Sequence, residues 1–135
     1  MRHVAIFPKD YIVRILNREK TIESRFSKVK CSPYGQVNAG DIIFLKEQSG
    51  PIVGQVKVIQ VIFFSGLTPE KVLAIKRQYN DRLRADDDFW KTKMDANYAT
   101  LMFLGDIQAL SPYAFKKKDR RGWVVLDHPQ LSFYR

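Results

Sequence analysis

Apolar and polar positions alternate along six short runs that are rich in β-branched and aromatic side chains. These runs span residues 3–7, 21–26, 41–47, 52–64, 97–110 and 123–126. Runs of this kind, bounded by Gly, Pro, Asn and Asp, predict β-strands. In the run 52–64 the alternation fails near Ile59, where few polar positions remain. We expect either a β-bulge or burial of both strand faces at that point.

Helical spacing, together with matching start signals, predicts three helices. Residues 8–19 begin with Pro8, a residue that fits the first turn of a helix, and their apolar side chains fall on one side. Residues 69–80 follow Thr68, whose hydroxyl suits an N-cap. A short third helix is predicted near Asp86, because a run of three aspartates complements the positive end of a helix dipole.

Strands at both ends of the chain, with helices inserted between them, predict an α+β domain. We expect a small mixed, mostly antiparallel β-barrel with flanking helices. A length of 135 residues, with no repeat or linker, fits a single domain spanning 1–135. No run reaches the roughly 18–20 apolar residues of a membrane span, and the first residues lack a secretory signal. These features favour a cytoplasmic protein.

The charge balance points to a polyanionic partner. Lys and Arg number 23 against 14 Asp and Glu, a formal net charge of +9. Such an excess attracts nucleic acid, although positive charge can also serve solubility alone. The two histidines, His3 and His128, have no suitably spaced carboxylate or cysteine, so no metal site and no cofactor are predicted. The single cysteine, Cys31, excludes an internal disulfide.

A dense group of charges of both signs lies in residues 18–26. If this run ends in a strand, Thr21, Glu23 and Arg25 share one face, while the residues between them face the core. Lys20 would then stand at the mouth of the strand. The cations could hold a phosphate, ribose or base oxygen while Glu23 accepts from an amine. The alternative is a Glu–Arg ion pair that only braces the barrel.

Further cations and aromatic side chains extend the candidate site. Residues 116–121 place five cations around one acid shortly before Trp123, a combination typical of single-strand binding. The alternative is a solvated turn before a strand whose first residue fills the barrel. Tyr34 is a second stacking candidate. The candidate contacts to a nucleic-acid backbone are Lys28, Lys30, Lys116, Lys117, Lys118, Arg120 and Arg121.

The segment YIVRILNREKTIESRFS, residues 11–27, resembles the signature of the ASCH domain family, a branch of the PUA-like folds. The motif of that family reads glycine-x-Lys-x-x-Glu-x-Arg. Lys20, Glu23 and Arg25 match its functional letters, whereas Arg18 stands at the glycine. The resemblance extends to GDIIFLKE, GPIVGQVKV and YATLMFLGDI. It implies a PUA-like β-barrel with a cleft in which the charged residues of the motif face a ligand.

The same resemblance implies two functions, because members of the family are connected with RNA binding and some with hydrolysis of acetylated cytidine or of RNA. The first hypothesis is a nucleic-acid-binding domain that holds RNA or a modified nucleotide in a Lys/Glu/Arg cleft with a basic rim. Its candidate ligand-binding residues are Lys20, Thr21, Glu23, Arg25, Tyr34 and Trp123. A protein-interaction module is a third possibility without a sequence feature of its own.

The second hypothesis is a hydrolase that uses the same cleft, either an amidohydrolase on an acylated cytidine-type nucleoside or a ribonuclease. Its candidate catalytic residues are Lys20 and Glu23. Acetylcytidine hydrolases in the family place a threonine nucleophile three residues after the motif lysine. That position is Glu23 in this chain, and the threonine, Thr21, follows the lysine directly. The threonine mechanism therefore does not carry over.

Overall fold

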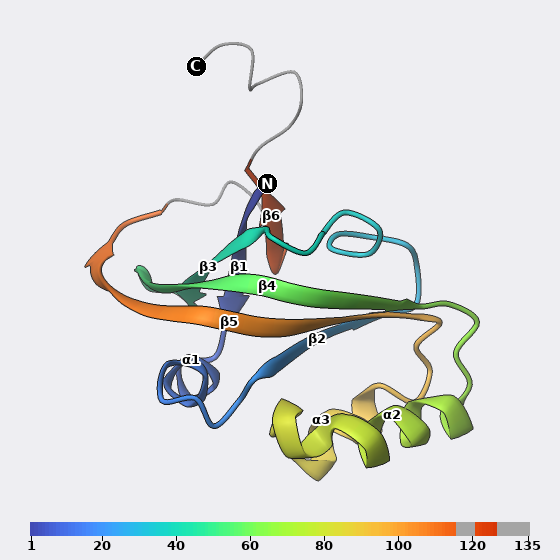
Figure 1. The fold of residues 1–135 in the computed structure, drawn as a ribbon. Helices are drawn as coiled ribbons and strands as arrows, with labels where there is room; N and C mark the ends of the chain where they lie inside the picture. Colours follow the sequence, from blue (N-terminus) through green and yellow to red (C-terminus); the bar gives the residue numbers. More distant parts are fainter. Residues whose placement is uncertain (116–120, 127–135) are drawn as a thin grey trace.

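The computed structural model describes residues 1–115 and 121–126. Within them the chain forms six strands and three helices (Figure 1). In chain order these are β1 (Arg2–Phe7), α1 (Lys9–Leu16), β2 (Ile22–Ser27), β3 (Ile42–Glu47), β4 (Ile52–Phe64), α2 (Pro69–Leu83), α3 (Asp87–Thr92), β5 (Tyr98–Tyr113) and β6 (Trp123–Val125). No helix in these two ranges is long and apolar enough to cross a membrane.

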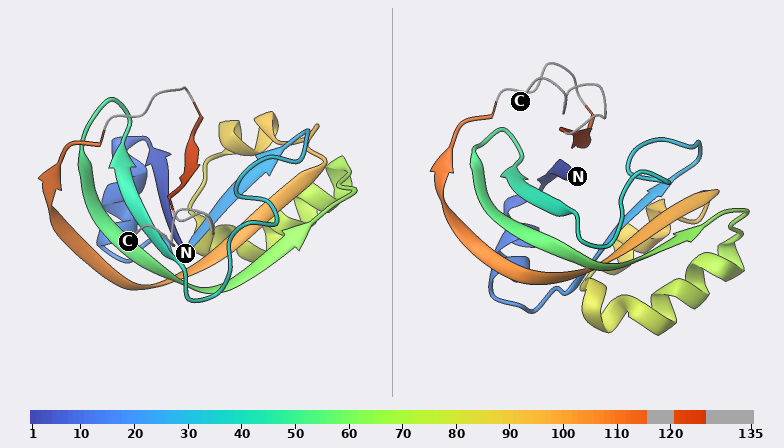
Figure 2. Two further views of the ribbon diagram at one scale, coloured as in Figure 1. Left: turned by 90° about the horizontal axis from the view of Figure 1, so that it is seen from above. Right: turned by 45° about the horizontal axis from the view of Figure 1, so that its top comes forward.

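All six strands belong to one sheet, in the order β2-β5-β4-β3-β1-β6. The β1–β3 pair is parallel and the other neighbouring pairs are antiparallel. The sheet curls into a half-barrel, with β2 at one edge and β6 at the other (Figure 2). The predicted α+β fold with a mixed, mostly antiparallel barrel is therefore confirmed.

Irregular pairing between β4 and β5 accompanies the curvature of the sheet. The register shifts at three places, one of them between Val58 and Gln60. Ile59 is the extra residue there and points to solvent, so the bulge rather than two-sided burial accounts for the broken alternation. Its side chain lies over Gly105, where an added Cβ would come within 2.6 Å of Ile59 Cδ1.

The sheet buries both faces, and consecutive residues of β5 enter different cores. Met102 belongs to a cluster on the concave side that includes Trp123. Leu101 belongs to a cluster formed with α2 and α3, which includes Ile22 and Trp90. Successive side chains of a strand point to opposite faces. Since Ile22 points toward α2 and α3, its neighbour Glu23 points to the concave face. The predicted division of β2 into an apolar and a charged face is thus present.

The caps of the helices follow the predicted signals with one difference. The Thr68 hydroxyl accepts from the backbone N–H of Lys71, and the Asp86 carboxylate from that of Phe89. Pro8 has ψ 146° and lies before α1 at the N-cap, rather than inside the first turn. The helix predicted over 8–19 ends at Leu16, because Arg18 adopts a φ of 69°, which no right-handed helix allows.

A buried polar chain attaches β6 to the rest of the sheet. The indole N–H of Trp123 donates to Nδ1 of His3 at 3.1 Å, so the ring proton of neutral His3 lies on Nε2, which donates to Asp41 at 2.8 Å. Burial raises the pKa of Asp41, but the bonds from His3, the Asn38 N–H and the N-terminal amine outweigh it and the pKa is lowered. Both ring nitrogens of His3 are thus used in hydrogen bonds within the fold.

Arg18 adopts a backbone conformation that favours glycine. A φ of 69° is left-handed, which costs an L-residue roughly 1–2 kcal/mol and glycine almost nothing. The backbone N–H of Arg18 donates to Ile15 at the end of α1, and the turn carries the chain directly to Lys20. Arg18 therefore holds under strain a backbone conformation that glycine would adopt freely.

Replacing Arg18 by glycine should stabilise the protein. Glycine removes the left-handed strain, but it adds about 0.4–1 kcal/mol of unfolded-state entropy, so we expect a net gain of about 0.5–1 kcal/mol in the free energy of unfolding. Urea denaturation measures it. Arg77→Gly on the exposed side of α2 is the control and should lose about 1 kcal/mol. A loss in both variants would contradict the strained turn.

Candidate functional site

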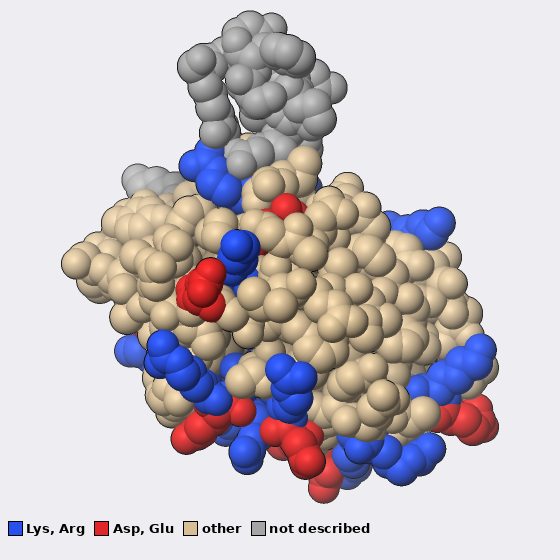
Figure 3. Space-filling view, in the orientation of Figure 1, with Lys and Arg blue, Asp and Glu red and all other residues tan. Residues whose placement is uncertain are grey.

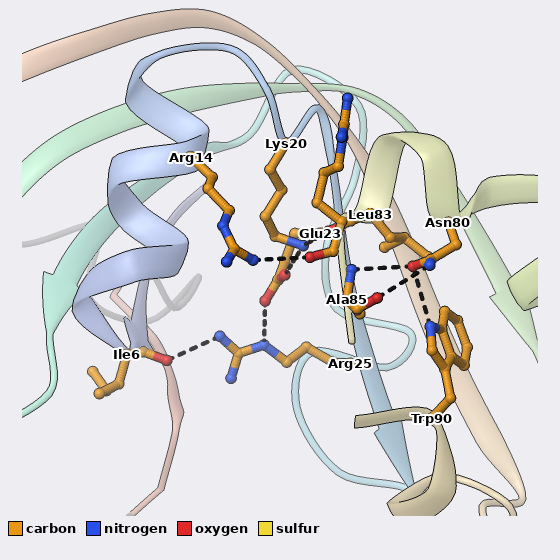
Figure 4. A network of polar contacts seen from close by, with 10 residues as sticks. Ile6, Arg14, Lys20, Glu23, Arg25, Asn80, Leu83, Ala85 and Trp90 are labelled. Atoms are coloured by element: carbon orange, nitrogen blue, oxygen red, sulfur yellow. Dashed lines mark hydrogen bonds and ion pairs between the residues drawn. The ribbon is translucent and has the colours of Figure 1, made fainter. Parts of the chain in front are cut away.

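Lys20, Glu23 and Arg25 converge through the carboxylate of Glu23 (Figure 4). Its Oε1 lies 3.3 Å from Nζ of Lys20, and its Oε2 accepts from Nε of Arg25 at 2.9 Å. Lys20 is 2% exposed and Glu23 4% exposed. The three residues predicted from the motif therefore form one continuous ionic network on the concave side of β2.

The C-terminus of α2 positions the lysine. Nζ of Lys20 donates to the carbonyl of Leu83 at 2.6 Å, and Nη1 of Arg14 on α1 donates to the carbonyl of Arg84 at 3.1 Å. The last carbonyls of a helix lack partners within the helix and carry partial negative charge. Two cations from the α1 region therefore hold the end of α2 beside the strand that carries Glu23.

Arg25 spans the open side of the half-barrel. It projects from edge strand β2, yet its Nη2 donates to the carbonyl of Ile6 in β1 at 3.1 Å, and its Nη1 to that of Gly122 at 3.3 Å. The guanidinium carbon also lies 5.0 Å from the ring centre of Phe7 and 5.2 Å from that of Trp123. One side chain thus connects two regions that share no backbone ladder.

The network forms one wall of a cavity of about 330 Å³. Its charged lining consists of three cations and one carboxylate, and four aromatic rings contribute to the other walls. Arg25, 24% exposed at its side chain, brings the network to the opening. The charged residues are Lys20, Glu23, Arg25 and Lys93, and the aromatic residues are Phe7, Tyr11, Phe26 and Phe89.

Burial perturbs the titration of the groups that line the cavity. Desolvation lowers the pKa of Lys20, although the neighbouring Glu23 carboxylate acts in the opposite direction. Desolvation likewise lowers the pKa of Lys93, assisted by repulsion from Arg25. The pKa of Tyr11 is raised by burial and then by Glu23. Perturbed groups gathered in one hollow are typical of functional sites.

Tyr11 and Lys93 are two of the cavity residues that the sequence analysis did not propose. Lys93 follows α3, and its ammonium lies 4.8 Å from the ring centre of Phe89 and makes no ion pair with any described residue. Tyr11 has the ring over which Lys20 lies, at 5.1 Å. Neither residue belongs to the Lys-x-x-Glu-x-Arg motif, and they reach it only because α1 packs on β3 and β5 and α3 packs against Phe26 of β2. No local sequence signal distinguishes them.

Several other candidates lie away from the cavity. The hydroxyl of Thr21 accepts from Nε of Arg82 at 2.9 Å, and Thr21 is not part of the cavity wall. Lys28 forms an exposed ion pair with Asp95 at 2.8 Å. Lys30 and Arg121 are exposed. Lys116, Lys117, Lys118 and Arg120 lie outside the described residues.

The two aromatic candidates meet at a second, smaller hollow beside the first. Tyr34 packs edge-on against Phe63 and Tyr98, with ring centres 5.3 Å and 5.0 Å away. Trp123 is 3% exposed and belongs to the concave core. Its burial matches the alternative that the first residue of the last strand fills the barrel. Trp123 therefore offers a ligand little free surface.

Charge on the outer surface is mixed on the face that Figure 3 shows. Lys and Arg side chains gather along the lower edge of this face, over the helices, and Asp and Glu side chains lie among them. The ion pairs of Arg14 with Asp10 and of Lys76 with Asp87 belong to these helices. Attraction of a polyanion to this edge is therefore partly offset by its own carboxylates.

The fold is that of a known domain class. The crystal structure of ASCH from Zymomonas mobilis matches with a TM-score of 0.73 and 12% sequence identity, over 97% of this chain and 91% of that chain. Two single-substitution variants of that protein match with the same score and identity, over 98% of this chain and 95% and 93% of theirs. No family model and no curated protein matches the sequence.

The chain therefore has the ASCH fold, and the resemblance seen in residues 11–27 is confirmed at the level of the fold. The likeness extends over nearly the whole chain, as the sequence segments outside the motif indicated. In this chain the motif residues are the ones that converge in the ionic network.

Removing the charge of Glu23 should destabilise the fold. Glu23→Gln keeps the shape but leaves Lys20 buried without its carboxylate, so we expect a loss of about 3 kcal/mol in the free energy of unfolding. Glu19→Gln, an exposed change nearby, should alter it by less than about 0.5 kcal/mol. Urea denaturation compares the two variants.

A double variant tests whether the unpaired charge of Lys20 causes the loss of stability in Glu23→Gln. Lys20→Met combined with Glu23→Gln removes the unpaired buried charge, and it should regain part of the stability lost in Glu23→Gln. Equal losses in the single and the double variant would show that Lys20 does not depend on Glu23 for compensation.

Proposed function

We propose that this chain binds RNA, or a modified nucleotide within RNA, in the cavity walled by Lys20, Glu23 and Arg25. One observation carries the proposal: a cavity of about 330 Å³ combines an organised ionic network with aromatic walls. Ligand sites in proteins range over roughly 300–1,000 Å³ and are mostly apolar with a few placed polar groups. The cavity lies at the lower end of that range, which suits a single nucleotide unit.

The chemistry of the walls supports a base as the buried part of the ligand. Aromatic rings such as Tyr11 and Phe89 offer stacking surfaces, the usual way in which proteins hold an unpaired base. The carboxylate of Glu23 accepts hydrogen bonds from exocyclic amines, and Arg25 and Lys93 donate to carbonyl or phosphate oxygens. Three cations against one carboxylate leave the cavity positive, in keeping with an anionic ligand.

Contacts outside the cavity would supply affinity rather than selectivity. The formal charge of +9 favours a polyanion, and backbone contacts with phosphates do not depend on sequence. We propose Lys28, Lys30 and Arg121, with Lys116, Lys117, Lys118 and Arg120, for this role. Tyr34 and Trp123 belong to the proposal as well, through the second hollow, whereas Thr21, whose hydroxyl accepts from Arg82, lines neither hollow.

Lys93 offers the sharpest test of the cavity, because it lines the walls without an ion pair to a described residue. Loss of a charge-assisted hydrogen bond costs about 1.5–3 kcal/mol, so Lys93→Met should weaken binding of a random-sequence single-stranded RNA 12-mer by about tenfold or more. The control Lys91→Met changes an exposed lysine of the adjacent helix and should leave the affinity nearly unchanged.

Fluorescence anisotropy measures both affinities, and a salt titration of the wild type should show a steep loss of binding. Salt-independent binding, or equal affinities of the two variants, would contradict the proposed site.

One observation also favours a second candidate function, a hydrolase. Lys20 is a buried amine with a lowered pKa, held against the Glu23 carboxylate at the cavity wall. Such a pair can shuttle a proton while the carboxylate orients water for attack on an amide or a phosphodiester. Arg25 would stabilise the negative charge that develops on oxygen. Thr21 lies outside the cavity wall, which fits a mechanism without a threonine nucleophile.

Turnover distinguishes the two functions. If the hydrolase hypothesis holds, wild-type protein should deacetylate acetylated cytidine or cleave a labelled RNA, and the double variant Lys20→Met, Glu23→Gln should abolish that turnover. Thr21→Val is the control and should retain it, because its hydroxyl contacts Arg82 rather than the cavity. Chromatography of the products provides the measurement. RNA binding by the wild type without turnover would exclude the hydrolase and leave the binding function.

A further inference from the structure

A second hollow of about 170 Å³ lies directly beside the first cavity. The two share Arg25 and Phe26 in their walls, so they are neighbours along strand β2. The remaining walls come from the loop that carries Cys31 and Tyr34, from Thr100 on the paired strand β5, and from Gly122 before β6. Together the two hollows follow the open edge of the half-barrel.

The chemistry of the second hollow differs from that of the first. Four hydroxyl groups line it, no carboxylate does, and its one charged residue is Arg25. The hydroxyl of Ser27 donates to the carbonyl of Val29, and that of Ser32 contacts the side chain of Gln36. The hydroxyl residues are Ser27, Ser32, Tyr34 and Thr100.

Arg25 lies at the division between the hollows and retains donors for a ligand. A guanidinium has five N–H groups, and three of them donate to Glu23, Ile6 and Gly122, which leaves two. The side chain is 24% exposed and braced on three sides by these bonds. A fixed cation with spare donors between two hollows is suited to an anionic group that connects two ligand units.

We propose that the second hollow holds the ribose-phosphate of the nucleotide adjacent to the one in the first cavity, with Arg25 on the connecting phosphate. This inference rests on the proposed RNA-binding function and specifies its ligand as a single strand of at least two nucleotides. Hydroxyls and guanidinium groups are the side chains that contact phosphate and sugar oxygens. No carboxylate lines this hollow, and Glu23, which pairs with Arg25, lines the first cavity.

The single cysteine of the chain reports on this hollow. Cys31 is exposed and lines its wall, so a maleimide should label it selectively. At saturating concentration, the random-sequence RNA 12-mer should slow this labelling about tenfold, because the bound strand covers the thiol for most of the time. Unchanged labelling at saturating RNA would overturn the second hollow as a binding site.

A blocking variant tests the same hollow by affinity. Cys31→Trp places a large side chain at its wall and should weaken binding of the RNA 12-mer about tenfold, the equivalent of about 1.4 kcal/mol. Val29→Trp is the matched control. It adds the same side chain two residues earlier, at a position that is 66% exposed and outside the hollow, and it should bind like the wild type. Thermal unfolding checks that both variants are folded.

The outcomes separate this inference from the function on which it rests. If the wild type binds the RNA, and Cys31→Trp and Val29→Trp bind it equally well, the second hollow is wrong and the first cavity stands. If Cys31→Trp alone weakens binding, the two-hollow path is supported. If the wild type does not bind RNA at all, the proposed function itself is overturned.

Discussion

The carboxylate of Glu23 is the point on which this structure depends. It pairs with two cations, buried Lys20 and partly exposed Arg25. Each cation also contacts a separate part of the fold. Lys20 donates to the carbonyl of Leu83 at the end of α2, and Arg25 donates to carbonyls beside the opposite edge of the sheet. Burying these charges is costly, and mutual pairing with satisfied hydrogen bonds offsets that cost.

The two interpretations of the motif, brace and ligand site, describe the same atoms. A half-barrel leaves an edge open, and Arg25 spans that opening by side-chain bonds instead of a backbone ladder. A backbone ladder would close the opening, whereas a single side chain leaves space beside it. Both hollows border Arg25. Bracing fixes the guanidinium in one orientation, which lowers the entropy cost of binding a ligand there.

Arg18 shows how a fold persists while its motif changes. The position needs a left-handed backbone, and glycine satisfies this most cheaply, but the pairing network and the cap of α2 hold the turn in place with arginine. A local cost of about 1–2 kcal/mol is small beside the loss expected from breaking a buried ion pair. The chain therefore tolerates arginine at this turn, while Lys20, Glu23 and Arg25 stay paired in the network.

The sequence alone determined what depends on neighbours along the chain. Strand alternation placed Glu23 and Arg25 on one face, and the Thr68 cap and the three aspartates from Asp86 located two helices. Tertiary structure decided the remainder, since Tyr11 and Lys93 reach the cavity only when α1 packs on β3 and β5 and α3 packs against Phe26 of β2. Likewise Trp123, a stacking candidate by its position in the sequence, is drawn into the core by a partner 120 residues away, His3. No local pattern encodes such contacts, because they form only when distant segments meet.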